Sequence, residues 1–274
     1  MNTPLHPSLM RVARDIREIV AEQVAYRELL ARMTHRDLLL RYKQTIMGVG
    51  WAVLMPVVNT IVFSVIFMRV APLDTGMPYP LYAYSGLLAW NFFASSLRFA
   101  VTSLTANATL VTKVYFPREI FPLSAVTVTL VDSIVGSVVL AGLMIHYRVA
   151  VTPAIAMLPL VVLAETAFTC AMALALAMAN LFYRDVKYLF EIVMTVWMFA
   201  TSVVYPVDLV GSRWGLVLRL NPMVGIIEAF RSVVLRGQVP DATQFAMAAV
   251  VSFAALAAAW VTFHRLECRF AESV

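Results

Sequence analysis

Six stretches of the chain are long, apolar and almost free of charge. They cover residues 44–68, 75–97, 120–147, 149–183, 188–207 and 242–264. A helix needs roughly 20 apolar residues to cross the hydrocarbon core of a bilayer, and each stretch reaches that length. The acidic residues inside them are Asp132, Glu165 and Glu191, which are costly in hydrocarbon and are expected to be paired or to line a polar path. The pattern predicts an all-α membrane protein with six transmembrane helices.

The segment before the first stretch has a different periodicity. Apolar residues recur every three or four positions over residues 16–33, with Arg and Glu between them, which predicts an amphipathic helix on the membrane surface. Thr34, followed three residues later by Asp37, resembles a capping box and predicts that a second helix starts there and leads into the first span. This segment is either a basic membrane anchor or a helix that contacts a cytoplasmic partner or gates the entrance.

The connector between the last two stretches is too apolar for a free loop. Residues 211–220 and 223–235 have the composition of two short helices, separated by Asn221 and Pro222. Neither is long enough to cross about 30 Å of hydrocarbon, so the connector predicts a re-entrant helical hairpin next to a path or gate. The alternative is a helix on the lipid surface. In either case Glu228 and Arg231, three residues apart, are placed to form an ion pair.

The connector between the second and third stretches ends in a basic and aromatic cluster. Residues 113–119 read KVYFPRE. Aromatic residues and Arg commonly dominate the binding energy of protein interfaces, so this cluster is a candidate docking site. The same residues also fit an interfacial aromatic anchor with basic flanks.

The basic residues fix the expected orientation. With six spans, fifteen Lys and Arg residues fall on the side of the two chain ends and six on the other. Both termini are therefore expected in the cytoplasm. The first 43 residues also lack the apolar core and cleavage site of a secretory signal peptide. We expect a single transmembrane domain over residues 1–274, with a cytoplasmic amphipathic segment (1–45), a six-span core (46–264) and a cytoplasmic tail (265–274).

Composition argues against several classes of protein. Hydrophobic residues make up 61% and charged residues 14% of the 274-residue chain, against about 45–50% and 25% in soluble domains. This disfavours a soluble enzyme and a disulfide-stapled secreted domain. The net charge of +5 fits basic segments that face anionic membrane lipid, so no nucleic-acid partner is expected.

Motifs for bond-making chemistry are missing from the sequence. It has no G-x-x-x-x-G-K-[ST] phosphate-binding loop, and its four histidines are scattered rather than spaced as metal ligands. We therefore predict no catalytic residue, no metal site and no cofactor bound by this chain. Aromatic residues around spans two and five fit either a belt at the membrane surface or a path on which sugar rings stack. The candidates for such a path are Tyr82, Tyr84, Trp90, Phe93, Trp197 and Phe199.

Five sequence elements occur in an order typical of one transporter family. They are RYKQTIMGVGWAVLMPVVNTIVFSVIF (41–67), KVYFPREIFPLSAV (113–126), NLFYRDVKYL (180–189), the Tyr205-Pro206 pair and NPMVGIIEAFR (221–231). Together they resemble the membrane subunit of type-2 ABC exporters, in the branch that exports O-antigen, capsular and related surface polysaccharides, with teichoic acid exporters as relatives. The resemblance extends over about residues 25–270.

This resemblance implies an assembly and a division of labour. Two copies of the chain would pair as a homodimer around one channel in the bacterial inner membrane. A dimer of a separate ATPase subunit would bind below them and hold the ATP and Mg. The substrate would be a lipid-linked polysaccharide carried outwards from the cytoplasm.

The resemblance also assigns candidate site residues. The segment before span one would be the gate or interface helix, and two cytoplasmic motifs would couple to the ATPase. These coupling and interface candidates are Arg36, Asp37, Arg41, Lys113, Tyr115, Phe116, Pro117, Arg118, Glu119, Asn180, Arg184 and Asp185. The candidates in the re-entrant hairpin are Asn221, Pro222, Glu228 and Arg231.

Rival functions make different demands on the sequence. A type-2 exporter of a drug, lipid or other small molecule would share most of these motifs and stays open. A membrane glycosyl- or acyltransferase would need a polar catalytic cluster at one face, which the sequence does not offer. A membrane scaffold would not need a re-entrant hairpin.

Overall fold

The computed structural model describes residues 21, 23–43, 45–48, 50–113, 116–207, 215 and 218–273. These residues form helices and turns, with no strand among them. The long helices are α2 (Arg27–Tyr42), α3 (Gly50–Val65), α4 (Tyr79–Ala106), α6 (Ile120–His146), α7 (Leu158–Phe182), α8 (Val186–Phe199), α10 (Pro222–Val234) and α11 (Ala242–Ser273). The shorter elements are a π-helical turn η1 (Ile66–Val70), a helix α5 (Ala108–Lys113) and a 3-10 turn η2 (Pro153–Met157). The predicted all-α class is confirmed.

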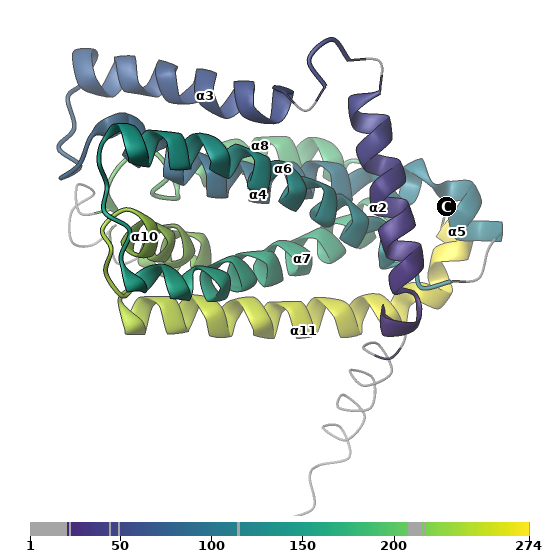
Figure 1. The fold of residues 1–274 in the computed structure, drawn as a ribbon. Helices are drawn as coiled ribbons and strands as arrows, with labels where there is room; N and C mark the ends of the chain where they lie inside the picture. Colours follow the sequence, from purple (N-terminus) through teal and green to yellow (C-terminus); the bar gives the residue numbers. More distant parts are fainter. Residues whose placement is uncertain are drawn as a thin grey trace, which may run out of the picture.

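Most of the long helices run side by side in one bundle. Figure 1 shows α10 at one end of this bundle and α5, with the carboxy-terminal end of α11, at the other; we call these the α10 end and the α5 end. α4 packs against α6, α7 and α3, and α11 packs along α7. α2 runs steeply across the α5 end and packs against α6 (Figure 1).

Among the described residues, four helices are long and apolar enough to cross a membrane. They are Gly50–Val70, Ile120–His146, Pro153–Phe182 and Ala242–Glu267. α4 has 28 residues and sufficient length, but its three Tyr and four Ser residues contribute to its absence from these four. α8 has only 14 residues. The described helices therefore show a multi-pass membrane protein.

The fifth predicted span is shorter than the sequence pattern suggested. Residues 188–207 were expected to form one crossing helix, but α8 ends at Phe199 and residues 200–205 form turns. Thr201, Ser202 and Val203 in these turns are fully buried. The apolar run continues past the helix because the turns lie inside the bundle.

The structure also changes two expectations at the chain ends. α2 is continuous from Arg27 to Tyr42, so the predicted new helix start at Thr34 is wrong. Residues 1–20 and 22 of the predicted amphipathic segment lie outside the described residues. At the other end, α11 continues to Ser273 and buries Phe270, rather than ending at His264 before a separate tail.

The described residues form three hydrophobic clusters, two large cores and a small one of Tyr79, Tyr82 and Ala83. The larger core fills the bundle around α4, whose buried side chains include Leu81, Leu97 and Val101. The second core lies at the α5 end and joins elements that are distant in sequence. Its buried members are Leu104, Val111, Phe116, Ile120, Phe121, Leu174, Ala177, Leu181, Phe263 and Phe270, with side chains of α2 packed against them.

Candidate functional site

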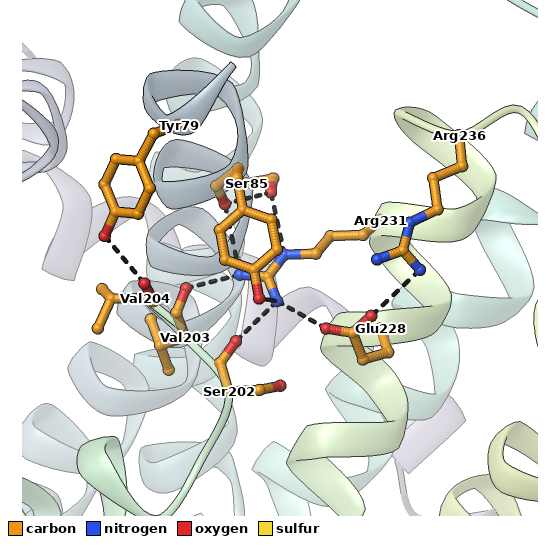
Figure 2. Close-up of polar contacts among 9 residues, drawn as sticks. Tyr79, Ser85, Ser202, Val203, Val204, Glu228, Arg231 and Arg236 are labelled. Atoms are coloured by element: carbon orange, nitrogen blue, oxygen red, sulfur yellow. Dashed lines mark hydrogen bonds and ion pairs between the residues drawn. The ribbon is translucent and has the colours of Figure 1, made fainter. Parts of the chain in front are cut away.

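Arg231 of α10 is a fully buried arginine. Its guanidinium donates to the Tyr82 hydroxyl at 2.9 Å, the Ser202 carbonyl at 2.7 Å and the Val203 carbonyl at 2.6 Å. It also forms an ion pair with Glu228 at 2.8 Å, which confirms the pairing predicted from their spacing. Charge-assisted hydrogen bonds of this kind compensate the cost of burying the charge. Figure 2 shows how Arg231 ties α10 to the turn after α8.

The same arginine is fixed against α4. Its guanidinium lies 3.7 Å from the centre of the Tyr82 ring, in cation–π geometry, and within 3.4 Å of the Ser85 hydroxyl. Gly86 leaves the space that the guanidinium occupies, because a Cβ at Gly86 would lie 2.3 Å from Arg231 Nη2 and 2.2 Å from the Val203 carbonyl oxygen. We call Arg231, Tyr82, Ser85, Ser202, Val203 and Glu228 the Arg231 cluster. The structural need for Gly86 was missed by sequence reasoning, although Ser85 and Gly86 form a small-residue pair typical of close helix packing.

α10 begins where the predicted second hairpin helix begins. The Asn221 side chain accepts from the Met223 amide at 3.1 Å as an N-cap, and Pro222 occupies the first turn. The Asn221 amide also donates to the Thr201 hydroxyl at 2.9 Å, which links α10 to the turn after α8. The first predicted hairpin helix (211–220) lies mostly outside the described residues.

A cavity of about 220 Å³ lies beside α10. Its polar lining includes Arg219, Glu228, Arg236, Asp241 and Gln244. Glu228 reaches Arg236 at 3.3 Å as well as Arg231, so one carboxylate bridges a buried and a half-exposed arginine (Figure 2).

The carboxy-terminal end of α2 is anchored on an acidic residue of α6. Arg41 and Tyr42 both donate to the Asp132 carboxylate, which we call the Asp132 cluster. Arg41 also lies 4.0 Å from the centre of the Phe99 ring. Burial and the hydrogen bond to Asp132 raise the pKa of Tyr42 above its ordinary value, so its hydroxyl stays protonated and remains a donor. This pairing confirms the expectation for Asp132.

Asp132→Ala should release the end of α2 from α6. The change leaves the half-buried Arg41 and Tyr42 without their acceptor, at a cost on the order of 1–3 kcal/mol. Hydrogen–deuterium exchange over α2 should rise while the protein still inserts into the membrane. The control is Ser133→Ala, which changes a neighbour that lines the same cavity. Unchanged exchange over α2 in Asp132→Ala would show that this anchor is dispensable.

The other α2 candidates bind within the chain as well. Arg36 pairs with Asp37 at 2.8 Å and donates to the Asn107 side chain at 3.2 Å. Asp37 accepts from the Ser124 hydroxyl at 2.9 Å. Arg36, Asp37 and Arg41 therefore fasten α2 across α4 and α6.

A cavity of about 480 Å³, with both polar and apolar lining, lies between α2, α3, α4 and α6. Its polar lining includes Asn59, Asn91, Ser95, Arg98 and Thr129 together with the Asp132 cluster. At its edge, Arg98 of α4 forms a two-armed ion pair with Glu191 of α8, with distances of 2.8 and 3.0 Å. Both side chains are about half exposed, at 52% and 51%. Arg98 lies eight residues before the end of α4, which is about 12 Å along the helix.

Most of the described residues of the 113–119 region are buried or half-buried. Phe116 and Pro117 are buried, and Glu119 is 1% exposed. Arg118 is half-buried and donates to the Val111 carbonyl at 3.2 Å. Lys113 alone among the described candidates of this region is exposed. Tyr115 lies outside the described residues.

The second predicted motif lies next to α5. Asn180 is buried at the end of α7, and its Oδ1 has no hydrogen-bond partner among the described residues. Arg184 and Asp185 are exposed in the turn between α7 and α8. A cavity of about 380 Å³ is lined by residues of this turn, of the end of α4 and of the start of α5. The structure therefore gathers Lys113, Arg184 and Asp185 as exposed residues of the α5 end.

The aromatic candidates for a glycan path require a correction. Tyr82, Tyr84, Trp90 and Phe93 are all less than 5% exposed and fill the core of the bundle. Trp197 packs edge-on against the Phe93 ring at 5.3 Å. Phe199, at 56%, is exposed. The four α4 rings are buried because α4 is the central helix of the bundle. The apolar and aromatic composition of α4 alone did not distinguish a central helix from one that lines a path.

Two further acidic sites appear in the described residues. Glu119, His264 and Glu267 come within 4.8 Å of one another, and His264 lies 3.6 Å from Glu119. Glu267 also accepts from the Arg118 backbone amide at 3.0 Å. Glu165 of α7 is buried, and its Oε1 has no hydrogen-bond partner among the described residues. The sequence left pairing and a place on a polar path open for this residue.

These features define a multi-pass helical membrane protein whose polar residues are concentrated in a few internal clusters and at one exposed edge. Over residues 28–235 the chain matches the ABC-2 type transporter family, and it belongs to that family. It is similar to the O-antigen export system permease protein RfbA of Myxococcus xanthus, with 31% identity over 259 residues that cover 93% of this chain and 99% of the relative. A protein of the same name from Klebsiella pneumoniae is 25% identical over 248 residues, which cover 89% of this chain and 94% of the relative. The family resemblance inferred from the sequence motifs is confirmed.

Proposed function

We propose that this chain is the membrane-spanning permease subunit of an ATP-driven exporter that moves a lipid-linked, O-antigen-like polysaccharide out of the cytoplasm across the bacterial inner membrane. Membership of the ABC-2 type transporter family and similarity to O-antigen export permeases along nearly the whole chain support this proposal.

The observation that carries a transport role is the half-exposed Arg98–Glu191 pair at the edge of the cavity between α2, α3, α4 and α6. Arg98 directly follows the predicted second span and Glu191 lies near the start of the fifth, so the pair lies at one end of these spans. Ionisable side chains are costly where they face lipid, and they commonly line ion or substrate paths. We therefore infer that water, substrate or a second protein, rather than lipid, contacts the edge formed by α4 and α8. A homodimer with this edge facing the path would hydrate the pair.

The proposal includes six membrane crossings and a re-entrant hairpin. α4 would form the second crossing and α8 with its following turns the fifth, while α10 would be the second hairpin helix. At 13 residues α10 spans about 20 Å, which is too short to cross the bilayer. The Arg231 cluster would then hold the hairpin at a fixed position at the outer end of the path.

The α5 end would face the cytoplasm, together with both chain termini, and dock on a dimer of a separate ATPase subunit. Lys113, Arg184 and Asp185 are exposed there and would make the contacts. The buried Phe116, Pro117, Glu119 and Asn180 would position that surface rather than touch the partner. ATP and Mg would be held by the ATPase, and this chain would supply the path and the mechanical connection.

Localisation of the glycan in a deletion strain tests the function. Without this chain, long lipid-linked polysaccharide should accumulate inside the cell and disappear from the surface, and the wild-type gene should restore export. The trapped polymer would identify the sugar. Unchanged surface glycan in a strain without a redundant exporter would reject the polysaccharide and leave a type-2 exporter of a drug, lipid or other small molecule.

A further inference from the structure

The loop between α5 and α6 is fastened to the far end of the chain. The backbone amide of Arg118 donates to Glu267 Oε1 at 3.0 Å, and the Arg118 guanidinium donates to the Glu267 carbonyl oxygen. The same guanidinium donates to the Val111 carbonyl at the end of α5, at 3.2 Å. One arginine thereby links α5, the loop and the last turns of α11.

Apolar packing supports the same connection. Phe116 of the loop, Phe121 of α6 and Phe263 and Phe270 of α11 are members of the second core. The Phe116 and Phe121 rings are 5.4 Å apart, and the Phe263 and Phe270 rings are 4.9 Å apart. The end of α11 is therefore part of the body on which the loop rests, and not a tail outside it.

We propose that Glu267 is a positioning residue for the docking surface. Its Oε1 holds the Arg118 backbone, and so sets the direction in which α5 and the exposed Lys113 point. The inference rests on the proposed function, in which α5 docks on an ATPase. It gives the carboxy-terminal end of α11 a role in coupling. The match to the transporter family ends at residue 235, before α11.

Two substitutions separate the geometry of the acceptor from its charge. Glu267→Gln removes the charge but keeps a carbonyl oxygen at the same reach. Glu267→Asp keeps the charge but is shorter by one methylene, so its oxygens cannot reach the Arg118 amide without movement of the backbone. The proposal requires Gln to behave like the wild type and Asp to behave like Glu267→Ala.

The first readout is the mobility of a spin label at Thr112, an exposed residue of α5, in the purified chain with Cys170 and Cys268 replaced. Mobility should rise in Glu267→Ala and Glu267→Asp and stay low in Glu267→Gln. The control is Thr262→Ala, because the Thr262 hydroxyl is exposed and binds only the Ala258 carbonyl of its own helix among the described residues. The second readout is glycan export per inserted molecule, which should fall several-fold in the same two variants.

Each outcome either supports or overturns the positioning role of Glu267. Unchanged mobility in Glu267→Ala, or equal mobility in Glu267→Gln and Glu267→Ala, would overturn the positioning role. A purely structural role would lower the thermal midpoint in all Glu267 variants and leave export per inserted molecule unchanged, which also overturns it. The mobility measurement needs neither ATPase nor substrate, so it stands even if the deletion strain rejects polysaccharide export.

Discussion

Replacing Arg231 with alanine should unfold the α10 end of the bundle. The change leaves the Tyr82 hydroxyl, the Ser202 and Val203 carbonyls and Glu228 without their shared donor in a buried site. Each buried acceptor that loses its donor costs about 1–3 kcal/mol, and several are lost here, which is a large part of the stability of a typical domain. Glu228 is 21% exposed and keeps Arg236 as a partner, so its charge is not left uncompensated. The measurement is the thermal midpoint and the yield of folded protein after size-exclusion chromatography in detergent.

Two companion variants make this result specific. Arg236→Ala removes the other arginine bound to Glu228, but its side chain is 40% exposed, so we expect a loss of at most about 1 kcal/mol. Arg231→Lys keeps the charge but cannot reach all the acceptors at once, and we expect an intermediate loss. Equal midpoints for Arg231→Ala and Arg236→Ala would refute the role of the buried cluster.

Gly86→Ala should be nearly as damaging, although it adds a single methyl group. The added Cβ would lie 2.2 Å from the Val203 carbonyl oxygen and 2.3 Å from Arg231 Nη2. α4 and the turn after α8 would have to separate, and the buried hydrogen bonds of the guanidinium would be lost with them. Overpacking alone costs about 1–3 kcal/mol, and we expect the broken cluster to add to it. The thermal midpoint and the export of glycan should both fall.

The matched control is another helical glycine. Gly142 of α6 has no atom within 4 Å of the position that a Cβ would take. Alanine is better than glycine in a helix interior by roughly 0.5–1 kcal/mol, so Gly142→Ala should be neutral or slightly stabilising. The two substitutions are chemically identical and are expected to have opposite signs. A tolerated Gly86→Ala would mean that α4 and the turn are less tightly packed than this structure describes.

Much of the architecture could be predicted from the periodicity of the sequence. The long apolar stretches become α3, α4, α6, α7 and α11, and Asn221-Pro222 marks the start of α10. The Glu228–Arg231 pair also follows from local spacing, because residues three apart share one face of a helix. These features depend on residues that are close in sequence.

The features that sequence reasoning missed depend on contacts between distant segments. Nothing local shows that the Ser202 and Val203 carbonyls turn inwards to meet Arg231, or that Arg98 finds Glu191. Burial of an aromatic residue is likewise decided by which helix lies at the centre, and a transmembrane stretch is apolar on all sides. Tyr82 and Phe93 were therefore indistinguishable from path-lining rings until the packing of α4 was known.

The second core has a consequence for how the chain is made. It joins Phe116, near the middle of the sequence, to Phe263 and Phe270, which are synthesised well after it. Until those residues emerge, the loop after α5 lacks the support of α11, and the second core lacks the part of its apolar packing that Phe263 and Phe270 supply. A nascent or prematurely terminated chain would thus expose an apolar patch of the kind that chaperones and proteases bind.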